Sequence, residues 1–354
     1  MAAAAGARGR FDREVQPGFA WQGGEAMGMT EWPIDPAKGA ARPGARATRR
    51  EAYAPFEGSN IGAWLGFKHF MYLMEEAAIQ HVRERWGGPG ALWREHGLGV
   101  EIVDSSIRIL TALHLDQLTR VEVRPREGDR EYELAATLEA RNDGRWAPAA
   151  SGGVRVLFRR SAEGAGALPA DLLRYVRDEI ERDRPVPAPI RSDGVGRGGP
   201  DARPARPPGV SADSFVWKRR IPYFYCHFMD RLQHSGYLRL MEEVVDLFLA
   251  ERGISIRTML ERRSWIPVVA EAGLEILREA RLEEEICTVF TVRHVYKGLL
   301  YPAAVDWYVG RGAEWVPTAR GRIVHGYAQI AQRGVMKLVP LDVPVLDALG
   351  SGTR

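Results

Sequence analysis

The sequence predicts an α+β protein in which one structural plan occurs twice, each copy a long helix packed on a curved antiparallel sheet. The first observation is a repeat: residues 70–77 and 237–244 share Leu-Met-Glu-Glu and lie 167 positions apart. The same offset, without a gap, superposes Pro55 on Pro222 and Leu65 on Leu232. Two units are too few for a solenoid, so the repeat indicates a fused pair of equivalent domains, a dimer in one chain.

Length and composition set the class of protein. A chain of 354 residues is long enough for two domains of roughly 130–160 residues with tails. A hydrophobic content of 45% and a charged content of 27% are typical of globular proteins. The net charge of +3 gives no indication of nucleic acid as a partner. No apolar run approaches the roughly 18 residues of a membrane span, and the start lacks the apolar core of a secretion signal.

The two cysteines, Cys226 and Cys287, are interpreted as small buried side chains in a reducing compartment rather than as a disulfide or a metal pair. Together with the absence of a targeting signal, this predicts a cytoplasmic location. No phosphate-binding glycine loop and no zinc motif occur in the sequence. We therefore expect no metal and no cofactor.

Five segments follow from composition and periodicity. Residues 1–45 mix Gly, Ala, Arg and Pro and are expected to form a flexible arm. The first domain is expected over 46–162 and the second over 213–345, with a tail at 346–354. Between them, 163–212 should hold a charged connecting helix at 171–183 and then a linker rich in Pro, Gly and Arg.

In the first copy, a strand at 47–56 and a polar loop at 57–62 precede the long helix. Apolar side chains recur at helical spacing from Phe67 to Val82, and the glycines and proline at 87–90 should end this helix. Alternating segments then predict four strands, at 100–113, 118–126, 131–141 and 145–160, with Asn142-Asp143-Gly144 as a turn.

The second copy restarts the plan with a strand at 215–227 and a loop at 228–234. Ser235 is placed to cap a helix at 236–252. Strands are expected at 273–281, 284–296, 303–309, 315–330 and 335–338. A long apolar helix laid across one face of a curved sheet, twice, buries both kinds of element.

This order of elements resembles the hotdog fold, most closely that of acyl-CoA and acyl-carrier-protein thioesterases. The residues that carry the resemblance are Tyr237-Leu238-Arg239-Leu240-Met241-Glu242-Glu243, the strand before them, and Leu338-Val339-Pro340-Leu341, which is similar to a Val-Pro-Leu-Pro ending in that family. The resemblance covers about 47–160 and 213–342. It implies two tandem hotdog domains, as a monomeric pseudo-dimer or a homodimer of double hotdogs, and an acyl-CoA or acyl-carrier-protein thioester as substrate.

The loop before the second helix departs from the family pattern. Many such thioesterases have Asp-x-x-Gly-His-Val-Asn-Asn-x-x-Tyr there. Counting back from Tyr237 puts His227 at the Asp position, Asp230 at the Gly position and His234 at the second Asn position. The resemblance therefore implies the place of the site but not its catalytic groups.

Thioester hydrolysis needs a carboxylate or imidazole to activate water and donors for the developing oxyanion. Asp230 is the predicted base or nucleophile, His234 is expected to orient or protonate, and His227 to assist. Free N–H groups at the helix start could stabilise the oxyanion, with Gly236 giving a thioester carbonyl close access. Tyr237 is a further candidate for substrate binding.

The glutamates on the two helices have two interpretations. Some hotdog thioesterases use a helix Glu as the catalytic carboxylate, and Glu242 is a candidate for substrate binding. The favoured expectation is that one Glu of each copy, in the pairs Glu75-Glu76 and Glu242-Glu243, makes a structural hydrogen bond across the dimer-like interface.

The first copy has a poorer loop, because Asn60, Ala63 and Phe67 replace His227, Asp230 and His234. This predicts one active site, built mainly by the second copy, with Asn60 as a possible substrate donor.

Two alternatives to a thioesterase stay open. The stretch from Asp230 to His234 resembles the Asp-x-x-x-Gln/His element of polyketide dehydratases, which are also double hotdogs and act on 3-hydroxyacyl thioesters. Their His-x-x-x-Gly-x-x-x-x-Pro string does not occur in this sequence. The third class is a non-catalytic acyl-thioester-binding protein.

Overall fold

The computed structural model describes residues 46–126, 130–161, 167–180, 182, 185–191, 206–227, 229–332 and 335–350, with only the backbone at His227. The expected arm at 1–45, the linker at 192–205 and the end of the tail at 351–354 lie outside the described residues.

The first half is a long helix against a curved antiparallel sheet. Helix α1, Phe67–Trp86, buries the apolar stripe that the spacing predicts and ends at Gly87, whose left-handed φ of 78° lets its N–H bond the Arg83 carbonyl. The strands around it are β1 (Thr48–Tyr53), β2 (Leu98–Ile109), β3 (Leu118–Pro125), β4 (Tyr132–Asn142) and β5 (Arg145–Arg160), and a short helix, α2 (Pro89–His96), leads into β2.

The second half repeats this plan around α3, His234–Glu251. Its strands are β8 (Phe215–Arg220), β11 (Trp265–Ile276), β12 (Glu285–Val292), β13 (Leu300–Arg311), β14 (Glu314–Gln332) and β15 (Val335–Val339), with the short helices α4 (Ile256–Arg263) and α5 (Val343–Ala348). The offset of 167 residues carries β1 onto β8, the start of α1 onto that of α3, α2 onto α4, β2 onto β11 and β3 onto β12. The duplicated α+β plan is confirmed.

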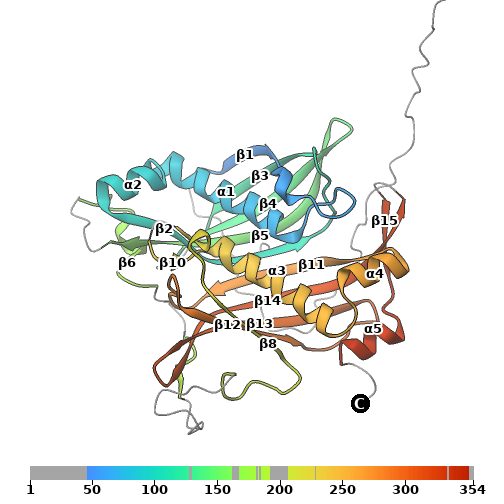
Figure 1. Ribbon diagram of the computed structural model, residues 1–354. Coiled ribbons are helices and arrows are strands. Elements are labelled where there is room, and N and C mark those ends of the chain that lie inside the picture. The colour runs from blue at the N-terminus through green and yellow to red at the C-terminus, as the bar shows by residue number, and fades with distance from the viewer. Residues whose placement is uncertain are drawn as a thin grey trace, which may run out of the picture.

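The two halves form one continuous sheet. Its strand order is β1-β3-β4-β5-β2-β11-β14-β13-β12-β8, so β2 and β11 pair at the centre, with Leu274 opposite Ser105. Figure 1 shows α1, in blue, and α3, in yellow, on the same side of this sheet, each cradled by the strands of its own half. The two helices therefore meet as they would in a dimer of single domains.

Several local predictions were wrong. The segment 171–180 is no long helix: it holds a 3-10 turn, Leu173–Tyr175, and strand β6, Val176–Arg177, which pairs parallel with β5. The reason is packing, because Leu172 and Tyr175 are buried and Tyr175 meets Tyr132 edge to face. Within the linker, β7 (Ile190–Arg191) pairs with β14. The tail expected from 346 begins inside α5.

The start of the second helix also differs from the prediction. The strand expected over 215–227 ends at Arg220 and is followed by a 3-10 turn (Tyr223–Tyr225) and a hairpin of β9 (Cys226–His227) and β10 (Arg231–Leu232). Helix α3 then begins at His234 with Gln233 as its N-cap, so Ser235 lies in the first turn rather than at the cap. In the described part of the chain, no helix is long and apolar enough to cross a membrane. Both cysteines are free thiols.

Candidate active site

The start of each central helix lies against the middle of the other, so the molecule has two equivalent positions for a site. At the first, Lys68 in the first turn of α1 forms an ion pair with Glu242 of α3. At the second, His234 in the first turn of α3 hydrogen-bonds Glu75 of α1 at 2.6 Å. The glutamates are equivalents in the repeat, and both contacts cross between the halves, as expected for one Glu of each pair.

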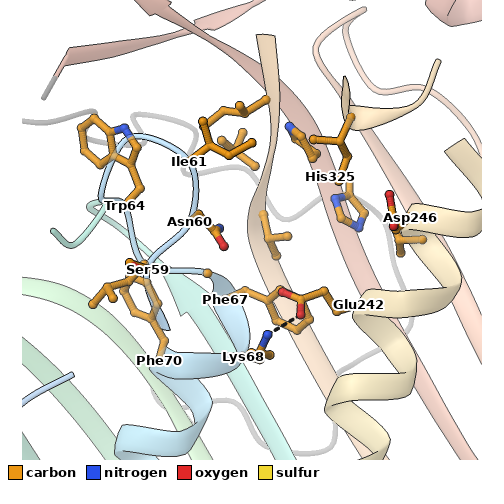
Figure 2. Close-up of a pocket in the computed structure, with 18 of the residues that line it drawn as sticks. Ser59, Asn60, Ile61, Trp64, Phe67, Lys68, Phe70, Glu242, Asp246 and His325 are labelled. Atoms are coloured by element: carbon orange, nitrogen blue, oxygen red, sulfur yellow. Dashed lines mark hydrogen bonds and ion pairs between the residues drawn. The ribbon is translucent and has the colours of Figure 1, made fainter. Parts of the chain in front are cut away.

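A cavity of about 580 Å³ opens at the first position. Its walls come from the loop before α1, from α3, and from β11 and β14 of the second half. Figure 2 shows Asn60 and Glu242 directed into it from opposite halves. Its lining includes the side chains of Asn60, Ile61, Lys68, Arg239, Glu242, Asp246, Val268, Val269 and His325.

Gly66 marks the point where the polar groups converge. It is the N-cap of α1, with an ordinary φ of −70°, so its backbone does not require glycine. A Cβ placed there would lie 3.2 Å from Asn60 Nδ2 and 3.5 Å from Glu242 Oε1. An amide donor and a carboxylate therefore lie together over the first turn of a 20-residue helix, whose free N–H groups and dipole favour negative charge.

The rim of this cavity carries both signs of charge. Lys68 pairs with Glu242, and Glu57 accepts a hydrogen bond from His69 at 3.1 Å, which holds the pKa of Glu57 below its usual value. Arg239 and Asp246 contribute one further charge of each sign. The ion pair fixes the direction of the Glu242 carboxylate without burying it completely, since the Glu242 side chain is 38% exposed.

The second position is closed by a buried chain of hydrogen bonds. His234 Nδ1 lies 2.6 Å from Glu75 Oε2, and His234 Nε2 lies 2.7 Å from the Ser105 hydroxyl on β2. Ser105 and His234 are 1% and 4% exposed. The cavity beside them measures only about 180 Å³. Both ring nitrogens of His234 are therefore engaged by the protein itself.

The structure places the predicted catalytic residues Asp230 and His234 in different surroundings. Asp230 is exposed in the turn between β9 and β10, where its carbonyl accepts a bond from the Leu282 N–H. The backbone of His227 pairs with Arg231 in the hairpin. His234 turns instead to Glu75 and Ser105.

The other residues predicted at the start of α3 have packing roles. A Cβ on Gly236 would lie 2.6 Å from a Leu232 methyl and 3.0 Å from the Tyr225 carbonyl, so protein fills the space expected for a thioester. Tyr237 is fully buried and packs edge to face on Trp307. A glycine is needed here because the hairpin approaches the helix closely.

Asn60 and Glu242 lie in the larger cavity, but at the start of the first helix rather than the second. Sequence reasoning missed Gly66, Lys68 and His325. The repeat at an offset of 167 residues was a usable signal for the site. If the two halves are treated as the subunits of a dimer, the start of each helix is expected to lie against the Glu of the other helix. Among the described residues, no cluster of three or more His, Cys, Asp or Glu side chains could hold a metal ion.

No protein-family model matches the sequence, and no curated protein matches it. Solved structures do match. A protein from Lactobacillus plantarum assigned as an oleoyl thioesterase aligns with a TM-score of 0.55 at 10% identity, over 80% of this chain and 97% of that one. An acyl-ACP thioesterase from Bacteroides thetaiotaomicron gives 0.50 at 12% identity, over 79% and 97% of the two chains.

A 12:0-ACP thioesterase from Umbellularia californica aligns with a TM-score of 0.50 at 11% identity, over 78% of this chain and 96% of that one. In each case nearly the whole of the other protein is matched, across both halves of this chain. The chain therefore shares the tandem hotdog fold of these three thioesterases.

Proposed function

We propose that this protein hydrolyses an acyl thioester in the larger cavity, at the start of α1. The observation that carries the proposal is the meeting of Asn60 and Glu242, from opposite halves, over the first turn of α1. A carboxylate that can accept a proton and a set of donors that can stabilise an oxyanion are the two requirements of this reaction.

The geometry supports a simple sequence of steps. The thioester carbonyl lies over Gly66, where its oxygen receives hydrogen bonds from the helix N–H groups and the Asn60 amide. Glu242 takes a proton from water as that water attacks the carbonyl carbon. The tetrahedral intermediate collapses, the C–S bond breaks, and the proton held by Glu242 passes to the sulfur. The products are a carboxylic acid and a free thiol.

Lys68 acts as a positioning residue in this scheme. Its ammonium pairs with Glu242 across the interface and keeps the carboxylate directed at the helix start. The Lys68 side chain is only 14% exposed, so the pair is shielded from solvent on one side. A shielded pair is weakened less by salt than an exposed one.

The substrate proposed is an acyl-CoA or acyl-carrier-protein thioester. The names of the Bacteroides and Umbellularia proteins support a carrier-protein substrate, and the Lactobacillus name supports a long acyl chain. The free thiols of Cys226 and Cys287 are compatible with the cytoplasmic location that we also propose.

A site in the second half, with Asp230, His234 and His227, is the competing proposal. It has less support, because Asp230 is exposed and both nitrogens of His234 are already bonded within the protein. The first location requires the Glu242 carboxylate for turnover and the second requires the Asp230 carboxylate. A variant of each residue therefore distinguishes the two locations.

The class of reaction is tested by thiol release from a panel of acyl-CoA and acyl-pantetheine thioesters of different chain lengths. A hydrolase releases one thiol for each acid formed. Loss of water from a 3-hydroxyacyl thioester without thiol release would identify a dehydratase instead. Binding of the panel without any turnover would identify a non-catalytic acyl-thioester-binding protein.

A further inference from the structure

His325 is a buried imidazole in the wall of the larger cavity, on β14. Its side chain lies beside the backbone of Val268 and stacks on Tyr301, with ring centroids 5.4 Å apart. The residue is 4% exposed, yet neither ring nitrogen makes a well-formed hydrogen bond within the described residues. Figure 2 shows the ring facing the cavity.

The equivalent position in the first half of the molecule shows which kind of side chain the fold itself requires where His325 lies. His325 pairs with Val269 on β11 and with Tyr301 on β13. In the first half, Val156 pairs with Ile102 on β2 and with Tyr132 on β4. Val156 is therefore the structural equivalent of His325, and it is completely buried. An apolar side chain satisfies this fold position, so the imidazole is not required by packing.

A buried imidazole with no well-formed hydrogen bond destabilises the protein unless something else bonds it. The cavity that His325 faces is lined by apolar side chains such as Ile61, Val268 and Val269, and also by Asp246 of α3. Burial lowers the pKa of His325 to about 3, so the ring is neutral at physiological pH. A neutral imidazole presents one N–H donor and one nitrogen acceptor, which suit a hydroxyl or a carbonyl better than a carboxylate.

We propose that His325 hydrogen-bonds a hydroxyl or keto oxygen carried by the acyl part of the substrate, so that the site selects oxygenated acyl thioesters over plain alkyl ones. This rests on the proposed function, because it takes the larger cavity as the acyl site. A site built to bond an oxygen discriminates strongly against the analogue that lacks it, since the protein group is then left unpaired.

The test measures binding separately from turnover. Non-hydrolysable acyl-pantetheine thioethers are prepared in pairs of equal chain length, with and without a hydroxyl or keto group at successive positions. Titration calorimetry with the full chain should give a Kd about tenfold or more lower for the oxygenated member of at least one pair. His325→Val, which copies Val156, should remove that preference while binding plain acyl analogues as well or better.

His325→Gln serves as a second variant, because its amide keeps a donor and an acceptor and should retain part of the preference. Thermal unfolding checks that both variants fold. The proposal is overturned if no oxygenated analogue binds better than its plain partner, or if the preference survives in His325→Val. If oxygenated analogues bind more tightly but no thioester releases thiol, the proposed hydrolysis is wrong, whereas the proposed role of His325 in binding is supported.

Discussion

At the scale of single residues, Gly66 and Gln233 show how the two copies differ. They are equivalents in the repeat and serve as the N-caps of α1 and α3. Gly66 faces Asn60 and Glu242 in the open cavity, where we propose that the thioester carbonyl approaches the helix start. Its φ of −70° is allowed for any residue. What glycine provides at this position is therefore room for a ligand next to the helix start, because it has no side chain.

Replacing Gly66 by alanine should lower kcat/KM by roughly ten- to a hundredfold, because the methyl group would occupy the approach to the oxyanion donors. Stability should fall by about 1 kcal/mol, since glycine is preferred to alanine at a helix N-cap. Steady-state thiol release and urea unfolding measure the two effects. Gln233→Ala, at the equivalent cap, is the control and should leave turnover unchanged. Full activity in Gly66→Ala would contradict the placement of the carbonyl.

Some site residues could be predicted from sequence and others could not. Asn60 and Glu242 were singled out from the repeat and the helix motif, and both line the larger cavity. Gly66 and His325 carry no local signal: one is an ordinary glycine before a helix, and the other is one histidine in a strand. Their meaning depends on which half faces which, and local spacing does not encode that contact.

At the scale of elements, α1, α3 and β2 meet at the hydrogen-bonded chain of Glu75, His234 and Ser105. The distances of 2.6 and 2.7 Å are also those of a serine, histidine and carboxylate triad. Ser105, however, is 1% exposed and does not line the adjacent small cavity. We interpret the chain as a structural tie that closes the second position.

Ser105→Ala should therefore cost about 1–3 kcal/mol of unfolding free energy, because it leaves a buried nitrogen of His234 without its partner. Thiol release should stay within about twofold of the unmodified protein. Urea unfolding and a thioester assay on the same sample give both values. A folded Ser105→Ala protein with abolished turnover would instead make this chain the active site.

The elements that sequence reasoning found are those with strong periodicity, above all α1 and β5. It missed α2 and α4, each only eight residues long. Pro89 was interpreted as the end of the first helix, although proline is also favoured at the first position of a new one. The Ser255 hydroxyl caps α4 by accepting a bond from the Thr258 N–H, a usable signal that was overlooked.

At the scale of the whole molecule, a buried charge cluster joins the halves beside the central strands. Arg159 of the first half bonds Glu279 of the second at 2.9 Å, and Arg231 bonds the same carboxylate at 2.5 Å. Glu101 Oε1 lies 3.8 Å from Arg231 Nη2, and the Glu101 residue is buried. Burial raises the pKa of Glu101 to about 7, although Arg231 opposes this.

This raised pKa gives a pH dependence with a definite sign. The folded state holds the Glu101 proton more tightly than the unfolded chain, whose carboxyl titrates near 4.5. Stability is therefore lost as pH rises from about 4.5 through about 7. Glu101→Gln copies the protonated form, so it should stabilise the protein at pH 8 by on the order of 1–3 kcal/mol and have little effect near pH 4.5.

Urea unfolding at the two pH values measures this effect. Glu84→Gln is the matched control, because the Thr48 hydroxyl lowers the pKa of Glu84 and its loss should not stabilise the protein at pH 8. If Glu101→Gln is instead less stable than the unmodified protein at pH 8, the attraction between Glu101 and Arg231 stabilises the fold by more than the burial of the Glu101 charge destabilises it.

The duplicated architecture places one open site and one closed position on a single chain. Two identical subunits would repeat the same site, whereas a fused pair can change each copy separately. Here the first copy keeps Gly66 and Phe67 where the second has Gln233 and His234. The open site therefore combines the start of the first helix with the glutamate of the second.

The most direct measurement of this claim is the rate of thiol release by Glu242→Gln beside Asp230→Asn, with acyl-pantetheine thioesters as substrates. Glu242→Gln should lower kcat about a hundredfold or more, because it removes the proposed base. Asp230→Asn should stay within about twofold. Full turnover in Glu242→Gln together with its loss in a folded Asp230→Asn protein would contradict the account and place the chemistry at the start of the second helix.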